Sequence, residues 1–347
     1  MGDAPAEPPA AVEAPATVTR TRLRTAFTVV VGLVLLGLVI YNADVDAIHD
    51  RMDELRWRSP LVLLPWVFIA WLDGLGWRCT LPADVAARVP LRSIVLTRMA
   101  GEAVNSVTPT AAVGGEPVKA QLLRAWGVSA TDSLASIVIA KTALTVTQSL
   151  FVVLGIAGLF VHLGRPGLGV AWVAFLLLAT VGFARTLVYM QRRGPVATVW
   201  RWLRRVIPRA RFLARLERSV EAIDERLAEF YTLERGAFWR AGTWHMAGWL
   251  GGVVEVWLIM YLIGAPIGWV EALIIEALSQ PIRAAAVIIP GGLGTQEVGG
   301  VALCLFLGMS APEAATLWLL KRGRELVFDG AGLIYLMRRS ASWRGAA

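Results

Sequence analysis

The sequence has little of what soluble enzymes use for chemistry. Its 347 residues include two cysteines, Cys79 and Cys304, far apart in the chain, which predict neither a disulfide framework nor a metal site. Its three histidines, His49, His162 and His245, are widely scattered. It contains no G-x-x-x-x-G-K-[ST] phosphate loop, no H-E-x-x-H motif and no G-x-S-x-G elbow. We therefore expect no enzymatic activity, no metal and no cofactor.

Charge is also scarce, and apolar residues dominate. Hydrophobic residues make up 56% of the chain and charged residues 17%, and the mean hydropathy is +0.59. Such a chain is too apolar for a soluble globular protein, so we predict an all-α, polytopic membrane bundle. The formal charge of +8 indicates the positive-inside bias and contact with lipid headgroups. No motif favours a nucleic-acid partner.

Eight apolar segments are predicted to meet the membrane, because a span needs about 20 apolar residues. They are 24–41, 60–79, 131–161, 168–190, 240–263, 268–289, 296–309 and 312–337. The seventh is short and follows a proline motif, so it is either a span or one arm of a re-entrant hairpin. Residues 94–113 are predicted to form a second re-entrant element, interrupted by Arg98, Glu102 and Asn105. Two such elements allow an inverted repeat.

A single transmembrane domain is predicted over residues 20–340, after a disordered Ala/Pro-rich tail at 1–19 and before a short tail at 341–347. Residues 191–239 are predicted to form a cytoplasmic loop. The segment 191–240 holds 12 Arg and 6 Asp+Glu, a net of 12 − 6 = +6. The positive-inside rule then predicts a multi-pass protein of the cell (inner) membrane with both termini in the cytoplasm.

An amphipathic helix is predicted in this loop, because six apolar residues alternate at spacings of three and four. They are Leu213, Leu216, Val220, Ile223, Leu227 and Phe230. A connecting helix that rests on the bundle or on the membrane is the preferred interpretation. A partner-binding coiled coil is the alternative, although the stripe is short for one.

Two short stretches share one pattern. V-T-P-T-A-A-V-G-G-E (107–116) and I-I-P-G-G-L-G-T-Q-E (288–297) each place a glutamate seven residues after a proline, across a glycine-bearing turn. A helix broken inside hydrocarbon survives only where protein or a water-filled cavity surrounds it. Paired breaks in the two halves of a membrane protein indicate a transporter's binding site. The alternative is that glycine and proline are simply common in membrane loops.

Ionisable side chains within spans cost about 2.5–3.5 kcal/mol each on insertion scales, so they are candidates for function. The predicted translocation site comprises Asn105, Pro109, Gly114, Gly115, Glu116, Lys119, Arg283, Pro290, Gly291, Gly292, Gly294, Gln296, Glu297, Arg322, Arg324 and Glu325. Lys141 and Glu255 are further charges within spans.

Roles follow from side-chain chemistry. Lys119 and Arg283 are the predicted anion contacts, with arginine suited to bidentate phosphate binding. The motif glutamates are expected to hold a cation, accept a proton or fix the basic residues. Arg322, Glu325 and Asp329 share one helix face, so they either pair with each other or point into a polar cavity.

Three segments carry a family resemblance: N-S-V-T-P-T-A-A-V-G-G-E-P-V-K-A-Q-L-L (105–123), I-I-P-G-G-L-G-T-Q-E-V-G-G (288–300) and L-L-K-R-G-R-E-L-V-F-D-G-A-G-L-I-Y-L (319–336). Over roughly residues 20–340 the chain resembles the flippase-like membrane domain family, related to the transmembrane part of lysylphosphatidylglycerol synthase. The Q-E-x-G-G and R-x-R-E-L elements are most similar to the branch found with hopanoid biosynthesis.

The resemblance implies lipid translocation between leaflets through a polar cavity built from two broken-helix elements. The lipid would have a polar or anionic headgroup, as in a hopanoid or another envelope lipid. A homo-oligomer and lipid-biosynthesis enzymes are the further partners considered. The alternatives are a membrane enzyme that uses Glu116 and Glu297 as acid and base, and a non-transporting scaffold for lipid biosynthesis.

The chain departs from the family pattern in three places. Many relatives have Asp and then Arg where this chain has Glu116 and Lys119. An E-R-x-x-D-like element of the third span is replaced by A-K-T-A-L-T-V-T-Q, which leaves Lys141 alone there. The aminoacyltransferase domain of the synthases is absent, so lysyl transfer is not expected.

Overall fold

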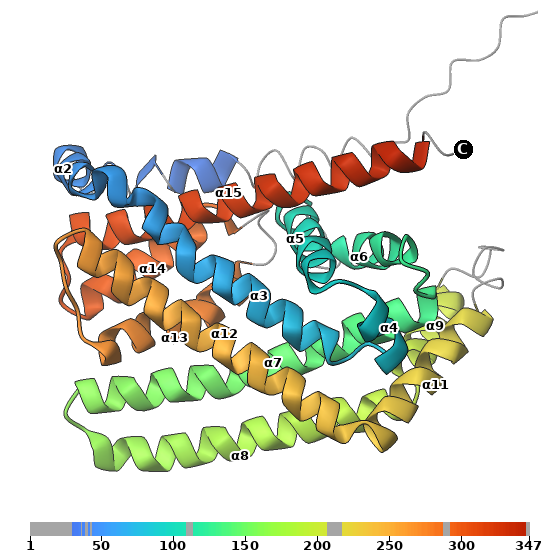
Figure 1. Cartoon of the computed structure of the whole chain (residues 1–347). Coiled ribbons are helices and arrows are strands. Elements are labelled where there is room, and N and C mark those ends of the chain that lie inside the picture. Colours follow the sequence, from blue (N-terminus) through green and yellow to red (C-terminus); the bar gives the residue numbers. More distant parts are fainter. Residues whose placement is uncertain are drawn as a thin grey trace, which may run out of the picture.

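The computed structural model describes residues 30–35, 37–38, 41, 44–108, 114–206, 217–286 and 292–344, and its regular elements there are all helices. In chain order they are α2 (Val45–Leu55), η1 (Arg56–Leu63), α3 (Leu64–Arg78), α4 (Ala83–Arg88), α5 (Leu91–Val107), α6 (Gly115–Arg124), α7 (Ala130–His162), α8 (Pro166–Gln191), α9 (Pro195–Val206), α11 (Glu217–Leu233), α12 (Arg235–Leu262), α13 (Trp269–Ala285), α14 (Thr295–Phe306) and α15 (Ala311–Arg344). They pack as a bundle (Figure 1). The predicted all-α class is confirmed.

Four helices are long and apolar enough to cross a membrane. They are Arg56–Arg78 (η1 with α3), Ala130–His162 (α7), Gly167–Gln191 (within α8) and Arg235–Leu262 (α12). They correspond to the predicted spans 60–79, 131–161, 168–190 and 240–263. Helix α8 packs on α7 at the edge of the bundle, and only 11% of its most apolar stretch is buried (Figure 1). The chain is therefore a multi-pass membrane protein with an outer helix suited to lipid contact.

The other predicted spans have a different character. Helix α13 has 17 residues and α14 has 12, while α15 has 34 residues but carries several charges. Half of the predicted span 24–41 and all of the predicted tail 1–19 lie outside the described residues. Helix α15 continues through Arg344, past the predicted domain end at 340, because no proline or glycine follows before Gly345. The count of eight segments and the inverted repeat stay predictions.

Both motifs interrupt the helical structure as predicted. Helix α5 ends at Val107 and α6 begins at Gly115, while α13 ends at Ala285 and α14 begins at Thr295. The motif glutamates both lie in the first turn of the helix that follows the break. Three predicted site residues lie outside the described residues, namely Pro109, Pro290 and Gly291. We call α5 with α6 the first hairpin and α13 with α14 the second hairpin.

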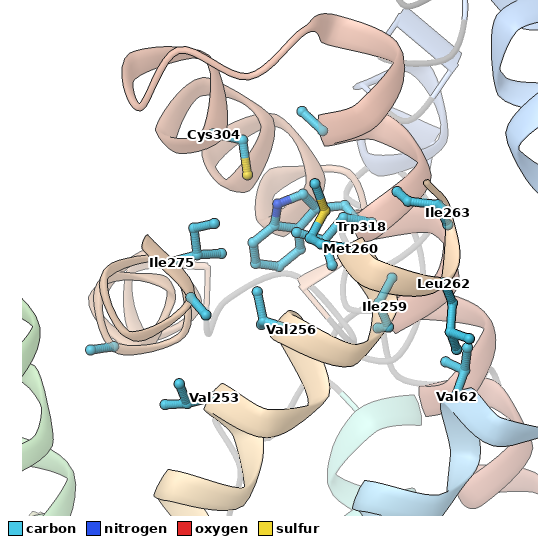
Figure 2. Close-up of a cluster of buried hydrophobic side chains, with 14 of the residues drawn as sticks. Val62, Val253, Val256, Ile259, Met260, Leu262, Ile263, Ile275, Cys304 and Trp318 are labelled. Atoms are coloured by element: carbon cyan, nitrogen blue, oxygen red, sulfur yellow. The ribbon is translucent and has the colours of Figure 1, made fainter. Parts of the chain in front are cut away.

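The largest apolar core joins the second hairpin to α12 and α15. Figure 2 shows Trp318 of α15 among Met260 of α12, Ile275 of α13 and Cys304 of α14. At Gly300 of α14 there is no room for a side chain, because a Cβ there would lie 1.8 Å from the Trp318 ring. Burial of these side chains fixes α13, α14 and α15 against the spanning helix α12.

The amphipathic stripe predicted within residues 191–239 packs on the bundle, which agrees with the interpretation preferred from the sequence. Ile223, Leu227 and Phe230 of α11 are buried in a cluster with residues of α7 and α12, and Val220 of α11 is also buried. The first two residues of the predicted stripe, Leu213 and Leu216, lie outside the described residues.

Candidate functional site

A cavity of about 360 Å³ lies between α3, α5, α7, α12, α13, α14 and α15. Nine charged side chains line it: Asp73, Arg98, Glu102, Glu276, Arg283, Arg322, Arg324, Glu325 and Asp329. Trp66 of α3 and Phe328 of α15 meet edge to face, with ring centroids 6.1 Å apart, and give the cavity an aromatic wall. Charges at such density within a membrane bundle are costly, so this cavity is the candidate functional site.

An arginine cluster, formed by Arg283 and Arg322 with their carboxylate partners, lines the cavity beside the second hairpin. The Nε of Arg322 lies 2.5 Å from a carboxylate oxygen of Glu297, and its NH1 lies 2.8 Å from Glu325. Arg283 donates to the same Glu325 at 3.0 Å. These contacts join α13, α14 and α15. Within the predicted stripe, Arg322 pairs with Glu325, and all three residues, Arg322, Glu325 and Asp329, line the cavity.

A lysine cluster lies at the first hairpin. Lys119 Nζ lies 2.6 Å from Glu102 and 3.2 Å from Glu116, and Lys141 of α7 lies 3.0 Å from Glu116. The side-chain oxygen of Asn105 accepts from the Gly115 N–H at 2.7 Å, which ties the end of α5 to the start of α6. Lys141, alone in its own sequence element, finds its partner on another helix.

The two arms of the first hairpin approach closely because both carry glycine where they meet. A Cβ at Gly115 would lie 1.9 Å from the carbonyl oxygen of Gly101, and a Cβ at Gly101 would lie 2.3 Å from the Lys119 side chain. The lysine stem therefore lies against bare backbone. Lys119 is 6% exposed and is not among the cavity-lining residues.

Four buried charges connect α12, α13 and α15. Lys321 lies 2.5 Å from Glu276 and 3.6 Å from Glu255, and Arg324 lies 2.9 Å from Glu255. The Arg324 guanidinium also stacks on Trp66, 3.8 Å from the ring centroid. Two carboxylates and two cations balance, so the group is neutral as a whole. Removal of one member would leave an uncompensated buried charge.

The predicted site residues divide into two groups around the cavity. Seven line it: Asn105, Arg283, Gly292, Gln296, Arg322, Arg324 and Glu325. Six lie outside that lining, at the hairpin breaks or in the ion pairs: Gly114, Gly115, Glu116, Lys119, Gly294 and Glu297. The glutamates therefore hold basic residues in place, one of the three roles expected for them.

Sequence reasoning missed the cavity residues Asp73 and Glu276, and also Lys321, which pairs with Glu276 in the buried group of four charges. Asp73 is the one acid inside the apolar run V-F-I-A-W-L-D-G-L-G-W. The free-energy cost of a carboxylate in such a segment was the signal that could have identified it. Only three of the 34 Lys+Arg are lysines, namely 119, 141 and 321, and all three take part in ion pairs inside the bundle. The small number of lysines in the sequence was thus the signal that could have identified Lys321 as a candidate.

Every arginine that lines the cavity already has a carboxylate partner. Arg98 lies 2.9 Å from Asp73, and the other three pair with Glu255, Glu297 or Glu325. An entering anion would therefore exchange with a carboxylate rather than meet a bare cation. Among the described residues, no group of three or more His, Cys, Asp or Glu has the arrangement of a metal site.

Comparison with known proteins gives the chain a family. Residues 25–331 match the family model described as "Lysylphosphatidylglycerol synthase TM region". A relative from Methanothermobacter thermautotrophicus (strain Delta H), described as "UPF0104 membrane protein", is 27% identical over 314 residues, which cover 86% of this chain and 90% of the relative. No solved structure matches the chain.

Proposed function

This chain belongs to the family of lysylphosphatidylglycerol synthase transmembrane regions, and on that premise we propose that it moves a polar-headgroup lipid between the two leaflets of a membrane. The headgroup would enter the cavity between the hairpins while the acyl or polycyclic tail stays in the bilayer. A volume of about 360 Å³ suits a headgroup and excludes a whole lipid.

The observation that carries this proposal is the concentration of nine charged side chains around one cavity in a membrane bundle. Well-packed apolar residues of similar volume would be as stable as buried ion pairs, or more stable. Stability therefore does not explain the charges. A route for a polar group across hydrocarbon does explain them, because the protein's dipoles and charges replace the water that the headgroup leaves.

The contacts proposed for a phosphate are Arg283 and Arg98. Both line the cavity, both are partly exposed to it and both are held by a single carboxylate. Lys119, the other anion contact predicted from sequence, is bound by two glutamates, and we propose that it fixes Glu102 instead. A phosphate that replaces a carboxylate at arginine keeps the guanidinium paired throughout.

Several finer features belong to the same proposal. The substrate is a hopanoid or another envelope lipid, an assignment supported by the Q-E-x-G-G and R-x-R-E-L elements. The protein lies in the inner membrane with both termini in the cytoplasm, which the net charge of 191–240 supports. It acts without enzymatic turnover, as a monomer or homo-oligomer, alone or beside lipid-biosynthesis enzymes.

Lipid movement in liposomes tests the proposal. Purified protein is reconstituted with a trace of fluorophore-labelled phosphatidylglycerol or labelled phosphatidylcholine, and dithionite bleaches the outer leaflet. We expect bleaching of the inner-leaflet label to accelerate with wild-type protein and not with Arg283→Ala or Glu297→Gln. Arg88→Ala is the control, because Arg88 pairs with Asp84 at an exposed position.

Failure of every labelled lipid to move, under every imposed gradient, would contradict the proposal. Mass spectrometry of the extracted lipids then separates the alternatives, since new lipid species would favour a membrane enzyme. Unchanged lipids, together with normal lipid composition in cells that carry charge-neutral variants of the motif glutamates, would favour a scaffold.

A further inference from the structure

A buried Asp–His pair lies at the edge of the cavity: Asp73 lines the cavity, and His245 behind it has been given no role so far. The Nδ1 of His245 on α12 lies 2.7 Å from Oδ1 of Asp73 on α3. His245 is 2% exposed and Asp73 is 8% exposed. Both residues belong to helices long and apolar enough to cross a membrane. The pair therefore places two titratable groups inside the bundle.

Glycines bring α3 and α12 together at this pair. A Cβ at Gly76 would lie 2.6 Å from the His245 ring, and one at Gly248 would lie 3.3 Å from Oδ1 of Asp73. Small residues let membrane helices approach closely enough for polar side chains to bond across them. The ring and the carboxylate thus occupy space that the two backbones leave open.

The imidazole keeps one nitrogen unused. An ionised Asp73 only accepts, so Nδ1 carries the proton of this hydrogen bond and Nε2 of the neutral ring is an acceptor. Nε2 is buried and has no hydrogen-bond partner among the described residues. A buried polar atom without a partner costs free energy, which makes it a candidate for a functional role.

Asp73 is shared with a cation that faces the cavity. Its Oδ2 lies 2.9 Å from NH1 of Arg98 on α5. Other charged groups of the neighbouring elements form ion pairs of their own: Glu102 with Lys119, Lys141 with Glu116, Glu276 with Lys321, and Arg324 with Glu255. The cavity acid Asp329 hydrogen-bonds with Ser106. Arg98 therefore competes with His245 for the negative charge of Asp73.

We propose that the Asp73–His245 pair is a proton-binding site linked to headgroup binding, an inference that rests on the proposed lipid transport. A lipid phosphate takes Arg98 from Asp73, and the freed carboxylate then stabilises a proton on Nε2 of His245. Before binding, Asp73, Arg98 and neutral His245 sum to zero charge. Afterwards phosphate with Arg98 and Asp73 with protonated His245 form two neutral pairs.

The charge balance makes the two ligands cooperative. The phosphate brings one negative charge and the proton one positive charge, so neither leaves an uncompensated charge in a low-dielectric interior. By linkage, a proton tightens headgroup binding by the same factor as the headgroup tightens proton binding. Histidine exchanges protons in the pH range of a cell, so a transmembrane proton gradient could drive lipid movement through this site.

Binding measurements in detergent test the site without any need for transport. The full chain is titrated with fluorophore-labelled phosphatidylglycerol between about pH 8 and about pH 5.5, the range in which histidine changes charge. A pH indicator in weak buffer reports proton uptake. We expect affinity to rise as pH falls, by at most about tenfold per pH unit for one linked proton. Uptake should approach one proton per lipid bound.

Variants assign the proton to this pair. His245→Asn keeps an amide donor near the position of Nδ1 and removes the ring, so we expect binding to persist with no proton uptake and no pH dependence. His245→Gln serves if that variant does not fold, as judged by thermal unfolding. His162→Asn is the matched control, because His162 also contacts a carboxylate through Nδ1, 3.2 Å from Glu271, but does not line the cavity. It should behave as wild type.

Each outcome decides the proposal. Wild-type affinity that does not change with pH, absence of phosphatidylglycerol binding, or equal proton uptake by His245→Asn would overturn it. Proton uptake with inorganic phosphate and not with the lipid would overturn the lipid assignment, and labelled diacylglycerol, which lacks phosphate, should cause none. Intact pH-linked binding without lipid movement in liposomes would count against the transport function and leave the proton site standing.

Discussion

The two hairpins share one sequence motif, but the ion pairs at their motif glutamates differ in exposure. In both, a glutamate lies in the first turn of the helix after a glycine-bearing break and contacts a cation of another helix. At the first hairpin, Lys141 is 48% exposed at its side chain and Glu116 is 13% exposed; at the second, Arg322 is 11% exposed and Glu297 is 2% exposed. The motif thus places the glutamate, and the partners decide how tightly it is held.

The partners also differ in chemistry. Lysine offers a point charge on a flexible stem, whereas arginine offers a rigid fork that can bind two carboxylates at once. Arg322 does so with Glu297 and Glu325, which fastens the second hairpin to α15. We infer that the second hairpin is the fixed wall of the cavity and that the first is the more easily moved one.

The largest effect should come from the second hairpin. In Arg322→Gln the almost fully buried Glu297 loses this guanidinium, so we expect a loss of about 3–5 kcal/mol of unfolding free energy and loss of lipid movement. Thermal unfolding of the detergent-solubilised protein measures the first effect. The double variant with Glu297→Gln removes the stranded charge and should recover part of the loss. If Arg322→Gln alone were as stable as wild type, the inference that the second hairpin is the fixed wall of the cavity would be wrong.

A smaller effect is expected where the arms of the first hairpin touch. In Gly115→Ala the new methyl would lie 1.9 Å from the Gly101 carbonyl oxygen, so the arms must separate, at a cost of about 1–3 kcal/mol. Gly330→Ala is the control, since nothing lies within 4 Å of a Cβ there. Equal unfolding temperatures for the two variants would mean that the close approach is not needed.

Within the first hairpin, the two lysines should differ. Lys119→Met removes a buried cation that contacts both Glu102 and Glu116. Lys141→Met instead removes a half-exposed pair worth at most about 1 kcal/mol. We expect Lys141→Met to unfold close to the wild-type temperature and Lys119→Met to unfold clearly lower. The reverse order would show that exposure does not separate the two contacts.

The smallest effect should come from outside both hairpins. Arg88 and Asp84 form an exposed pair on α4, one helical turn apart. Arg88→Ala should change the unfolding free energy by less than about 0.5 kcal/mol and leave lipid movement unchanged. A large effect there would mean that loss of any charge, rather than loss of a cavity charge, disturbs the protein.

The spanning helices were predictable because their signal is local. Long apolar runs such as 131–161 and 168–190 leave a helix as the only structure that satisfies the backbone in lipid, and α7 and α8 follow them closely. Helix breaks at proline and glycine are local as well, so the first-turn positions of Glu116 and Glu297 agree with the sequence.

The partners in the site were not predictable, because tertiary packing chooses them. Lys141 meets Glu116 across 25 residues of sequence, and Asp73 meets His245 across 172. Neither periodicity nor spacing encodes such distances. Arg283 and Glu325 were both identified as candidates, but only the tertiary structure shows that they share one ion pair between α13 and α15.

Blocking the cavity itself tests the central claim most directly. In a chain with Cys79→Ser and Cys304→Ala, a cysteine replaces Ser106, which lines the cavity from α5, and a small anionic thiol reagent modifies it in liposomes. Val161→Cys, at an exposed position on α7, is the control. The account predicts that modification at 106 stops lipid movement and that modification at 161 does not. Unchanged movement with residue 106 fully modified would contradict a headgroup route through this cavity.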